Sequence, residues 1–273
     1  MRCVVPYIYK HETFCKQRWF GKKIIDVFSK EFGAYSPEYY EEAIRNGRIR
    51  VNGERVTRDH ILKNGDRITH TVHRHEPPVP YSPVVILGET DDIIAVNKPA
   101  ALPVHPCGAY RYNSLETILR KENKLSEFYF IHRLDRVTSG VMLLAKRKDI
   151  ASKLSEQLVK GGFHKVYLAE AEGNCFEKPE IPGVFYTQQN GIAVDRNIAV
   201  VSQKEGIFKV DEKEGKPAYT YLFPLYYSKQ SNTTLMECVP ITGRTHQIRL
   251  HLKYIGHPID DDVNYNESIH VPK

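Results

Sequence analysis

The chain has 273 residues, of which 41% are hydrophobic and 26% charged, a balance typical of a globular protein with a substantial core. Its formal net charge is +6 and its pI is about 8.9, which permits a polyanionic partner without requiring one. No apolar run reaches the length of a membrane-spanning helix, so a helical membrane protein is not indicated.

The first unit of the chain is compact and rich in arginine. SPEYYEEAIRNG, residues 36–47, predicts a helix that begins with a Ser-Pro signal and ends at a glycine. RIRVNGERV predicts a hairpin around Asn52-Gly53, and a second turn at Asn64-Gly65 leads into another strand. The proline-rich residues 77–83 then read as a linker, so we expect one domain over 1–76 and another over 84–273.

The second unit alternates short strands with a few helices. Two strands are predicted around Asp91-Asp92, followed by a helix over 151–162 and a strand over 163–173. Residues 188–217 are turn-rich and predict hairpins, and a further strand is expected over 233–243. Helices and strands do not alternate regularly, which predicts an α+β fold.

The five cysteines are scattered, without a Cys-x-x-Cys pair, so neither a disulfide framework nor a zinc ribbon is indicated. The first twenty residues lack the apolar core of a secretion signal. We therefore expect a cytoplasmic protein, with a mitochondrial or nuclear location left open. The twelve histidines form no HExxH motif, and His246 and His251 lie on different faces of a helix, so no metal site is predicted.

One unusual stretch, residues 131–146, reads IHRLDRVTSGVMLLAK. It places Asp135 between Arg133 and Arg136, after a histidine and before a turn-like Thr-Ser-Gly run. From the residues alone, Asp135 can be a solvated ion pair, a helix cap or a reagent.

A second unusual stretch, residues 241–259, reads ITGRTHQIRLHLKYIGHPI. Thr242 or Thr245 can cap a helix that ends at Gly256. Helical spacing puts the apolar residues on one face and groups Arg249 with the polar residues on the other. The stretch is either an ordinary surface helix, or one whose Arg249 faces a cleft and pairs with a buried carboxylate or a phosphate.

These two stretches belong to four ordered blocks spread over residues 84–265. The others are HKVYLA, residues 164–169, and NKPAALPVHP, residues 97–106. Together the blocks resemble the signature set of RluA-type pseudouridine synthases, most closely the eukaryotic branch that modifies tRNA. The resemblance implies a mixed, mostly antiparallel central sheet with flanking helices, preceded by a small α/β RNA-binding module of αL type.

The resemblance also implies a reaction without cofactor or metal. A uridine in structured RNA is flipped out, its glycosidic bond is broken, and the uracil is reattached through carbon. The expected substrate is tRNA, in the anticodon stem-loop, with rRNA or mRNA as alternatives; we expect a monomer with no membrane partner. A non-catalytic RNA-binding protein with the same fold and a nucleoside hydrolase stay open, although hydrolases usually need two carboxylates.

The resemblance assigns roles to single residues. Asp135 matches the essential aspartate, which either attacks the nucleoside covalently or removes a sugar proton. Arg249 matches its cationic partner, and Tyr167 matches the tyrosine that lies against the flipped uracil. Arg133 matches a residue that enters the gap left by the extruded nucleotide. The remaining RNA-contact candidates in these blocks are Lys98, which supports the site or the phosphate path, Arg244 and His246.

The arginines of the N-terminal unit are candidates for phosphate contacts. A solvated surface is the alternative, because nearby glutamates dilute the patch. The candidates are Arg45, Arg48, Arg50, Arg55, Arg58 and Arg67.

The C-terminus departs from the family pattern. Asp262 and Tyr265 fit the D..Y spacing that follows GHPI, but family members generally continue with a further strand, whereas this chain stops at Lys273. The alternatives are a catalytic domain that is truncated or a fragment, or a divergent one with a shortened sheet, and the activity of this chain is left open.

Overall fold

The computed structural model describes residues 1–32, 34–178, 180–202 and 206–269. Two compact units share the chain, and neither is a continuous segment. The first unit comprises residues 1–85, 98–126 and 136–140, and the second comprises residues 86–97, 127–135 and 141–273. The predicted domain boundaries at residues 77–83 stay a prediction.

The first unit combines a four-stranded sheet with short helices. The strand order is β1-β4-β2-β3, and β1 pairs with β4 antiparallel over eight residues. Its elements are β1 (Tyr7–Phe14), a 3₁₀ turn (Gln17–Trp19), α1 (Ile24–Val27), a π-helical turn (Phe28–Phe32), α2 (Pro37–Arg45), β2 (Ile49–Val51), β3 (Glu54–Arg55), β4 (Arg67–Arg74) and α3 (Leu115–Lys121).

The predicted helix and turn of this unit are confirmed. The Ser36 hydroxyl caps α2 by accepting the backbone N–H of Tyr39 at 3.4 Å. Asn52 and Gly53 have φ angles of 53° and 88°, the left-handed pair that a two-residue hairpin needs. The strand β1 and the helices α1 and α3 were not predicted. For α3 the signals are present in the sequence, because Ser114 caps it by accepting the backbone N–H of Thr117, and Leu115, Ile118 and Leu119 follow helical spacing.

The second unit contains the remaining elements, apart from single residues at the ends of β5, β6 and β8. They are β5 (Val85–Glu89), β6 (Ile93–Lys98), β7 (Tyr129–Phe130), β8 (Gly140–Ala145), α4 (Lys148–Val159), β9 (Tyr167–Glu172), β10 (Val184–Tyr186), β11 (Ile192–Asp195), β12 (Ile198–Ser202), β13 (Ile207–Val210), β14 (Tyr219–Ser228), β15 (Thr233–Pro240) and α5 (Gln247–Tyr254).

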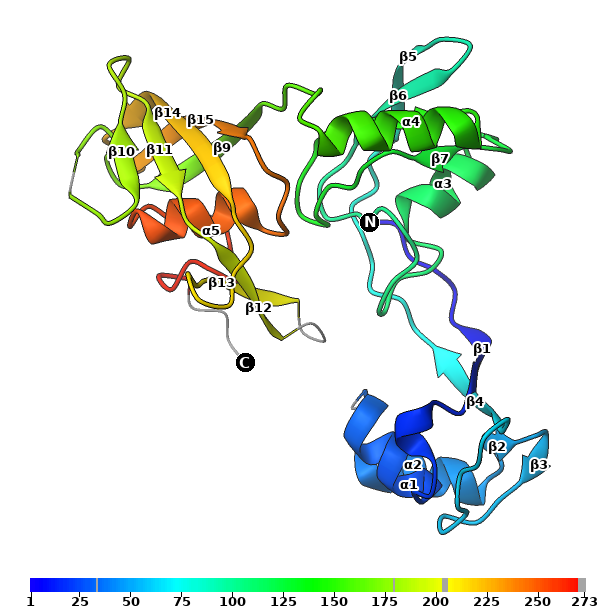
Figure 1. Cartoon of the computed structure of the whole chain (residues 1–273). Coiled ribbons are helices and arrows are strands. Elements are labelled where there is room, and N and C mark those ends of the chain that lie inside the picture. The colour runs from blue at the N-terminus through cyan, green and yellow to red at the C-terminus, as the bar shows by residue number, and fades with distance from the viewer. Residues whose placement is uncertain (33, 179, 203–205, 270–273) are drawn as a thin grey trace. The chain divides into compact units, whose positions relative to one another are not determined.

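A five-stranded sheet carries the helix α5 (Figure 1). Its strand order is β10-β11-β14-β15-β9, and every neighbouring pair is antiparallel. Leu222 and Met236 from the sheet form one buried cluster with Leu252 and Ile255 from α5. Burying these apolar side chains fixes the helix on the sheet. The predicted α+β fold with mostly antiparallel strands is confirmed.

A second sheet has the order β5-β6-β8-β7 and packs against α4 through Ala145, Ala151 and Leu154. The predicted strands around Asp91-Asp92 and the predicted helix are present, with α4 beginning three residues earlier than expected. Of the hairpins predicted over 188–217, β12 pairs with β13, and residues 203–205 lie outside the described residues. No helix in the described ranges is long and apolar enough to cross a membrane.

Candidate active site

Asp135 lies in an irregular segment between β7 and β8. His132, three residues before it, accepts the backbone N–H of Leu143 through Nε2 at 3.2 Å, which ties the segment to β8. Leu134 is buried, whereas the Asp135 side chain keeps 23% of its surface exposed. Asp135 therefore caps no helix, and its carboxylate is half-buried but still accessible.

The helix α5 brings a cation to this carboxylate. The Arg249 Nη1 atom lies 3.7 Å from Asp135 Oδ2, although the residues are far apart in sequence. Arg249 is only 8% exposed, and its Nε and Nη2 atoms each donate to Asp262 at 2.6 Å. The predicted pairing of Arg249 with a buried carboxylate is thus present, but its tightest partner is Asp262 and Asp135 is the looser one.

Asp262 orients Arg249 by a bidentate hydrogen-bonded pair. Burial alone would raise the pKa of Asp262, but the hydrogen bonds and charge of Arg249 lower it below its usual value. The Arg249 guanidinium also lies over the ring of Tyr265, with 4.7 Å to its centroid. The sequence named Asp262 and Tyr265 by their spacing only, and their part in the site was missed.

His246 is a further neighbour of Asp135. Its Nε2 atom lies 3.7 Å from Asp135 Oδ2, and its Nδ1 atom lies 2.6 Å from the Tyr265 hydroxyl. That hydroxyl accepts the N–H of Phe208 at 3.3 Å, so we infer that it donates its proton to Nδ1 and leaves the hydrogen of His246 on Nε2. Burial lowers the pKa of His246, which favours this neutral form.

The start of α5 differs from the prediction. The helix begins at Gln247, and the cap position is His246, in the left-handed conformation at φ 58° and without a side-chain cap. Thr242 instead donates to Gln247 Oε1 at 2.7 Å, and Thr245 is exposed. The predicted threonine cap is therefore wrong, because Thr242 serves the side chain of Gln247 instead of the helix backbone.

Buried polar contacts anchor α5 to the sheet. The Gln247 Nε2 atom donates to Tyr219 O and Thr220 Oγ1, both at 2.9 Å. Thr220 Oγ1 also lies 2.8 Å from Nδ1 of the buried His251, whose Nε2 reaches Arg196 O at 3.0 Å. His251 thus has a structural partner on each ring nitrogen, and the described residues contain no group of three or more His, Cys, Asp or Glu side chains that could hold a metal ion.

Tyr167 enters the site from the sheet. It is the first residue of β9 and pairs with Cys238 on β15. Burial and, to a smaller degree, the charge of Asp135 raise the pKa of Tyr167 above its usual value. The phenol therefore stays protonated at neutral pH and lies within the electrostatic reach of Asp135.

The other predicted residues of these blocks fall into two environments. Arg133 and Arg244 are exposed, and Arg244 donates through Nε to Pro217 O at 2.9 Å. Lys98 has no exposed surface, and its Nζ donates to the carbonyls of Pro99, Leu102 and Arg136 at 2.9, 2.7 and 3.2 Å. A direct contact of Lys98 with RNA does not fit this burial; the ammonium instead ties three loop carbonyls together.

The N-terminal arginines also divide. Arg58 forms an ion pair with Glu41, and Arg67 forms one with Glu12 at 3.6 Å. Arg45, Arg48, Arg50 and Arg55 have no carboxylate within ion-pair distance among the described residues. Arg48 lies over the Tyr39 ring at 4.7 Å, and Arg50 donates to the carbonyls of Gly47 and Gly53 at 3.0 and 3.1 Å.

Comparison with known proteins shows which family the chain belongs to. Residues 92–254 match the profile described as RNA pseudouridylate synthase, and residues 26–68 match the S4 domain. The chain belongs to the RNA pseudouridylate synthase family. The resemblance to the RluA type is thus confirmed, and the S4 match falls inside the predicted RNA-binding module.

Several relatives are similar to this chain over nearly all of its length. Pseudouridylate synthase RPUSD2 of Homo sapiens is 42% identical over 97% of this chain and 46% of its own length. The mitochondrial tRNA pseudouridine(32) synthase of Saccharomyces cerevisiae is 38% identical over 98% of this chain and 55% of its own length. The chain therefore spans about half the length of these two relatives.

Two further matches extend the comparison. Ribosomal large subunit pseudouridine synthase C of Escherichia coli is 34% identical over 90% of this chain and 77% of its own length. Among solved structures, Human RNA Pseudouridylate Synthase Domain Containing 1 superposes with a TM-score of 0.54 at 25% identity, covering 70% of this chain and 73% of that one.

Proposed function

We propose that this chain isomerises uridine to pseudouridine in RNA, with Asp135 as the reagent. The observation that carries the proposal is the half-buried Asp135 carboxylate, 3.7 Å from Arg249 and beside Tyr167, in a chain of this family. A carboxylate resists ionisation when it is removed from water, and the neighbouring guanidinium favours its charged form.

The proposed reaction conserves all atoms of the nucleoside. The bond between the ribose and the ring nitrogen of uracil breaks, and a bond from the same ribose carbon to a ring carbon forms. That ring carbon loses its proton, and the released nitrogen gains one. Asp135 acts either by adding to the nucleoside and leaving again, or by removing and returning a sugar proton.

The neighbours of Asp135 serve this reaction in different ways. Arg249 keeps the carboxylate charged while Asp262 holds the guanidinium in place. Tyr167 offers an aromatic face to a base that has lost its stacking, and its protonated phenol lies near the reacting ring. Arg133, exposed beside the site, enters the space that the flipped nucleotide leaves in the RNA.

The proposed substrate is tRNA, at a uridine of the anticodon stem-loop. Two yeast relatives are named tRNA pseudouridine(32) synthase and tRNA pseudouridine(31) synthase, and the S4 match adds an RNA-binding module. We propose that the protein works as a monomer in the cytoplasm, with the mitochondrion as the alternative, since one of these relatives is named as mitochondrial.

Tritium release tests the function. An unmodified tRNA transcript labelled on the ring carbon that loses its proton should release tritium to water with the wild-type chain and not with Asp135→Asn, while the RNA chain stays intact. Free uracil in solution would instead identify a hydrolase. RNA binding without release by either protein would contradict the enzymatic proposal and leave an RNA-binding function.

A further inference from the structure

A row of aromatic rings and cations runs along the first unit and contains none of the residues of the Asp135 site. At its centre, the guanidinium groups of Arg111 and Arg74 lie over the Tyr9 ring at 4.5 and 5.3 Å. The Tyr9 ring meets His11 at 4.6 Å on one side and Tyr7 at 6.4 Å on the other. These three β1 residues share a face because alternate side chains of a strand project to the same side.

The row continues from β1 onto the loop before α3. The Tyr7 ring meets the Tyr112 ring at 4.9 Å, and the Lys121 ammonium lies 4.3 Å from the centroid of Tyr112. At the other end, the His11 ring lies 6.3 Å from the His70 ring of β4. The aromatic–cationic row is defined as Tyr7, Tyr9, His11, Arg74, Arg111, Tyr112 and Lys121.

The row carries uncompensated positive charge. No carboxylate in the described part of the chain lies within ion-pair distance of Arg74, Arg111 or Lys121. The acid next to the row, Glu76, is buried and accepts the Tyr7 hydroxyl at 2.7 Å. Its other bonds come from the backbone N–H groups of residues 111–113, so it fixes the loop onto β1 instead of pairing with an arginine.

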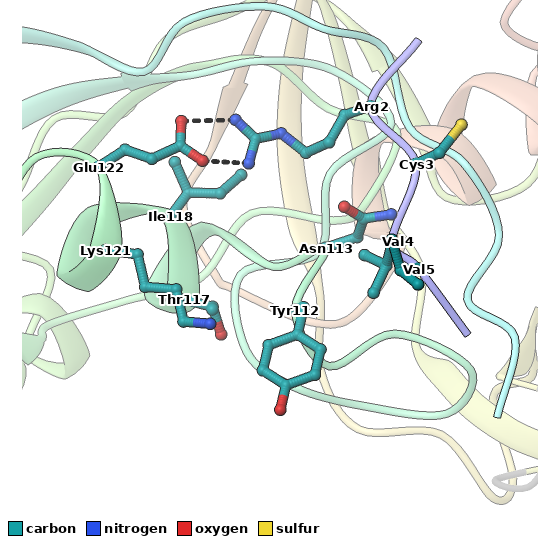
Figure 2. Close-up of a pocket in the computed structure, with 10 residues that line it drawn as sticks. All are labelled: Arg2, Cys3, Val4, Val5, Tyr112, Asn113, Thr117, Ile118, Lys121 and Glu122. Atoms are coloured by element: carbon teal, nitrogen blue, oxygen red, sulfur yellow. Dashed lines mark hydrogen bonds and ion pairs between the residues drawn. The ribbon is translucent and has the colours of Figure 1, made fainter. Parts of the chain in front are cut away.

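A pocket of about 310 Å³ lies at the Tyr112 end of the row (Figure 2). Tyr112, Thr117 and Lys121 line it together with Asn113. The Asn113 side chain is fully buried, and its Oδ1 atom has no hydrogen-bond partner in the described ranges. Figure 2 shows this oxygen turned toward the Arg2–Glu122 pair on the far side of the pocket. The pocket thus offers an aromatic ring and a cation, and it adjoins a buried acceptor that has no partner among the described residues.

We propose that the aromatic–cationic row is a second RNA-binding surface, with phosphates at Arg74, Arg111 and Lys121 and one unpaired nucleotide at Tyr112 and the adjoining pocket. Surfaces for unpaired nucleic acid combine a line of cations along the backbone with aromatic faces for the bases. Tyr112 is 36% exposed, and Arg74 and Arg111 are partly exposed where they lie over Tyr9. Arg74 also donates through Nη2 to Gly108 O at 2.5 Å, which leaves its other N–H groups for a phosphate. The inference rests on the proposed function, because it gives the RNA substrate of Asp135 a further contact.

Binding measurements on the full chain test the row. The probes are an unmodified tRNA transcript, which has unpaired loops, and a fully paired RNA duplex of equal length. The Arg74→Gln/Arg111→Gln variant should bind the transcript about 10-fold or more weakly, and the slope of log affinity against log salt should fall by about 1.5–2. The Tyr112→Leu variant should weaken transcript binding about 5- to 100-fold and leave duplex binding nearly unchanged.

A matched control removes two positive charges elsewhere in the same unit. Lys10 is exposed and alternates with the row residues of β1, so it projects from the opposite face, and Lys124 is exposed after α3. The Lys10→Gln/Lys124→Gln variant should bind the transcript within about twofold of wild type. Lys121→Gln, a change at an exposed side chain, should reproduce part of the loss seen with the arginines.

Three results would overturn the proposal: transcript affinity and salt slope unchanged in the row variants, equal losses in the lysine control, or competition by poly-glutamate as strong as by RNA. Tritium release by the wild-type chain separates this proposal from the proposed function. If the wild-type chain releases tritium and the row variants bind the transcript as wild type does, the proposal for the row is wrong and the proposed function stands. If no tritium is released but the row variants lose transcript binding as expected, the proposed enzymatic function is wrong and the row is supported as an RNA-binding surface.

Discussion

Two regions of the molecule place a guanidinium over a tyrosine ring at nearly the same distance. Arg249 lies 4.7 Å from the centroid of Tyr265, and Arg111 lies 4.5 Å from that of Tyr9. Only Arg249 also pairs with carboxylates, those of Asp262 and Asp135. Removing a paired, buried cation leaves buried carboxylates without their partner, whereas a partly exposed cation without a carboxylate, such as Arg111, is available to an incoming anion.

The largest effect should come from breaking the buried pair. Arg249→Leu leaves Asp262 and Asp135 without their cation, so we expect the free energy of unfolding to fall by about 3–5 kcal/mol and tritium release to be lost. Urea unfolding at pH 7 measures the first quantity. The matched change Arg111→Gln should alter the free energy of unfolding by less than about 1 kcal/mol. Equal stabilities of the two variants would remove the distinction between the regions.

Asp262→Asn should have a smaller effect, because Arg249 keeps its pairing with Asp135. We expect the free energy of unfolding to fall by about 1.5–3 kcal/mol, the value of a hydrogen bond to a charged group, and tritium release to be reduced but measurable. The lowered pKa of Asp262 makes its stabilisation fully present at neutral pH, and the stabilisation is lost as the pH falls through the folded-state pKa. A variant as stable and as active as wild type would show that Asp135 alone suffices to hold Arg249.

Local signals predicted much of the fold but only part of the site. Ser36 and Asn52-Gly53 determine their cap and turn through their own backbone chemistry, so both were found from sequence. Helical spacing assigned Arg249 to the polar face, yet the side chain is buried, because Asp262 arrives from an irregular segment with no periodic pattern. Pairings of this kind depend on tertiary contacts that spacing does not encode.

Lys98 is a second residue whose surroundings could not be predicted from the sequence. Its place in NKPAALPVHP suggested a cation for RNA, but the ammonium is buried against three loop carbonyls. Backbone acceptors carry no signature in the sequence, so the burial of a lysine by such groups cannot be read from residue types. The S4 match and the four motif blocks delimit the regions that hold the candidate residues, and the contacts within these regions required the structure.

The free energy of unfolding should also depend on pH through His70 of the first unit. We expect this effect to be smaller than those of the Arg249 and Asp262 substitutions. This side chain is 8% exposed among the rings of Tyr39 and Tyr40, and burial, together with His11 and Arg48, lowers its pKa from 6.5 to about 4. The unfolded chain therefore binds more protons in this range, so stability falls as the pH is lowered from 6.5 toward 4.

We expect a loss of about 1–2 kcal/mol in wild type over that pH window, less than the full shift implies because solvent screens the site partly. His70→Phe should lose less stability than wild type over the same window, and the difference is the contribution of His70, since the other groups that titrate in this range are common to both proteins. Urea unfolding of both proteins at pH 6.5 and 4.5 measures the difference. If the free energy of unfolding fell equally in both proteins between these pH values, His70 would bind its proton as readily in the folded chain as in the unfolded one, which would contradict the prediction.

Replacing the arginines of the S4 module that have no carboxylate partner should have the smallest effect on the free energy of unfolding. The same change should have a clear effect on RNA binding. Arg48→Gln/Arg50→Gln/Arg55→Gln removes three cations without a carboxylate partner, so the free energy of unfolding should change by less than about 1 kcal/mol. If these side chains contact phosphates, the salt slope of RNA binding should fall by about 2–3.

Arg58→Gln/Arg67→Gln, which removes two charges instead of three, is the control, and the salt slopes are compared per charge removed. These two cations already face Glu41 and Glu12 and release few counterions on binding. The salt slope of this control should fall by less than about 1. Equal changes in both variants would mean that the ion pairs open to RNA and that carboxylate pairing does not decide which arginines bind phosphate. The aromatic–cationic row was chosen by the same criterion, the absence of a carboxylate within ion-pair distance. That outcome would therefore weaken the argument for the row as well, and the binding measurements on the row variants would test it separately.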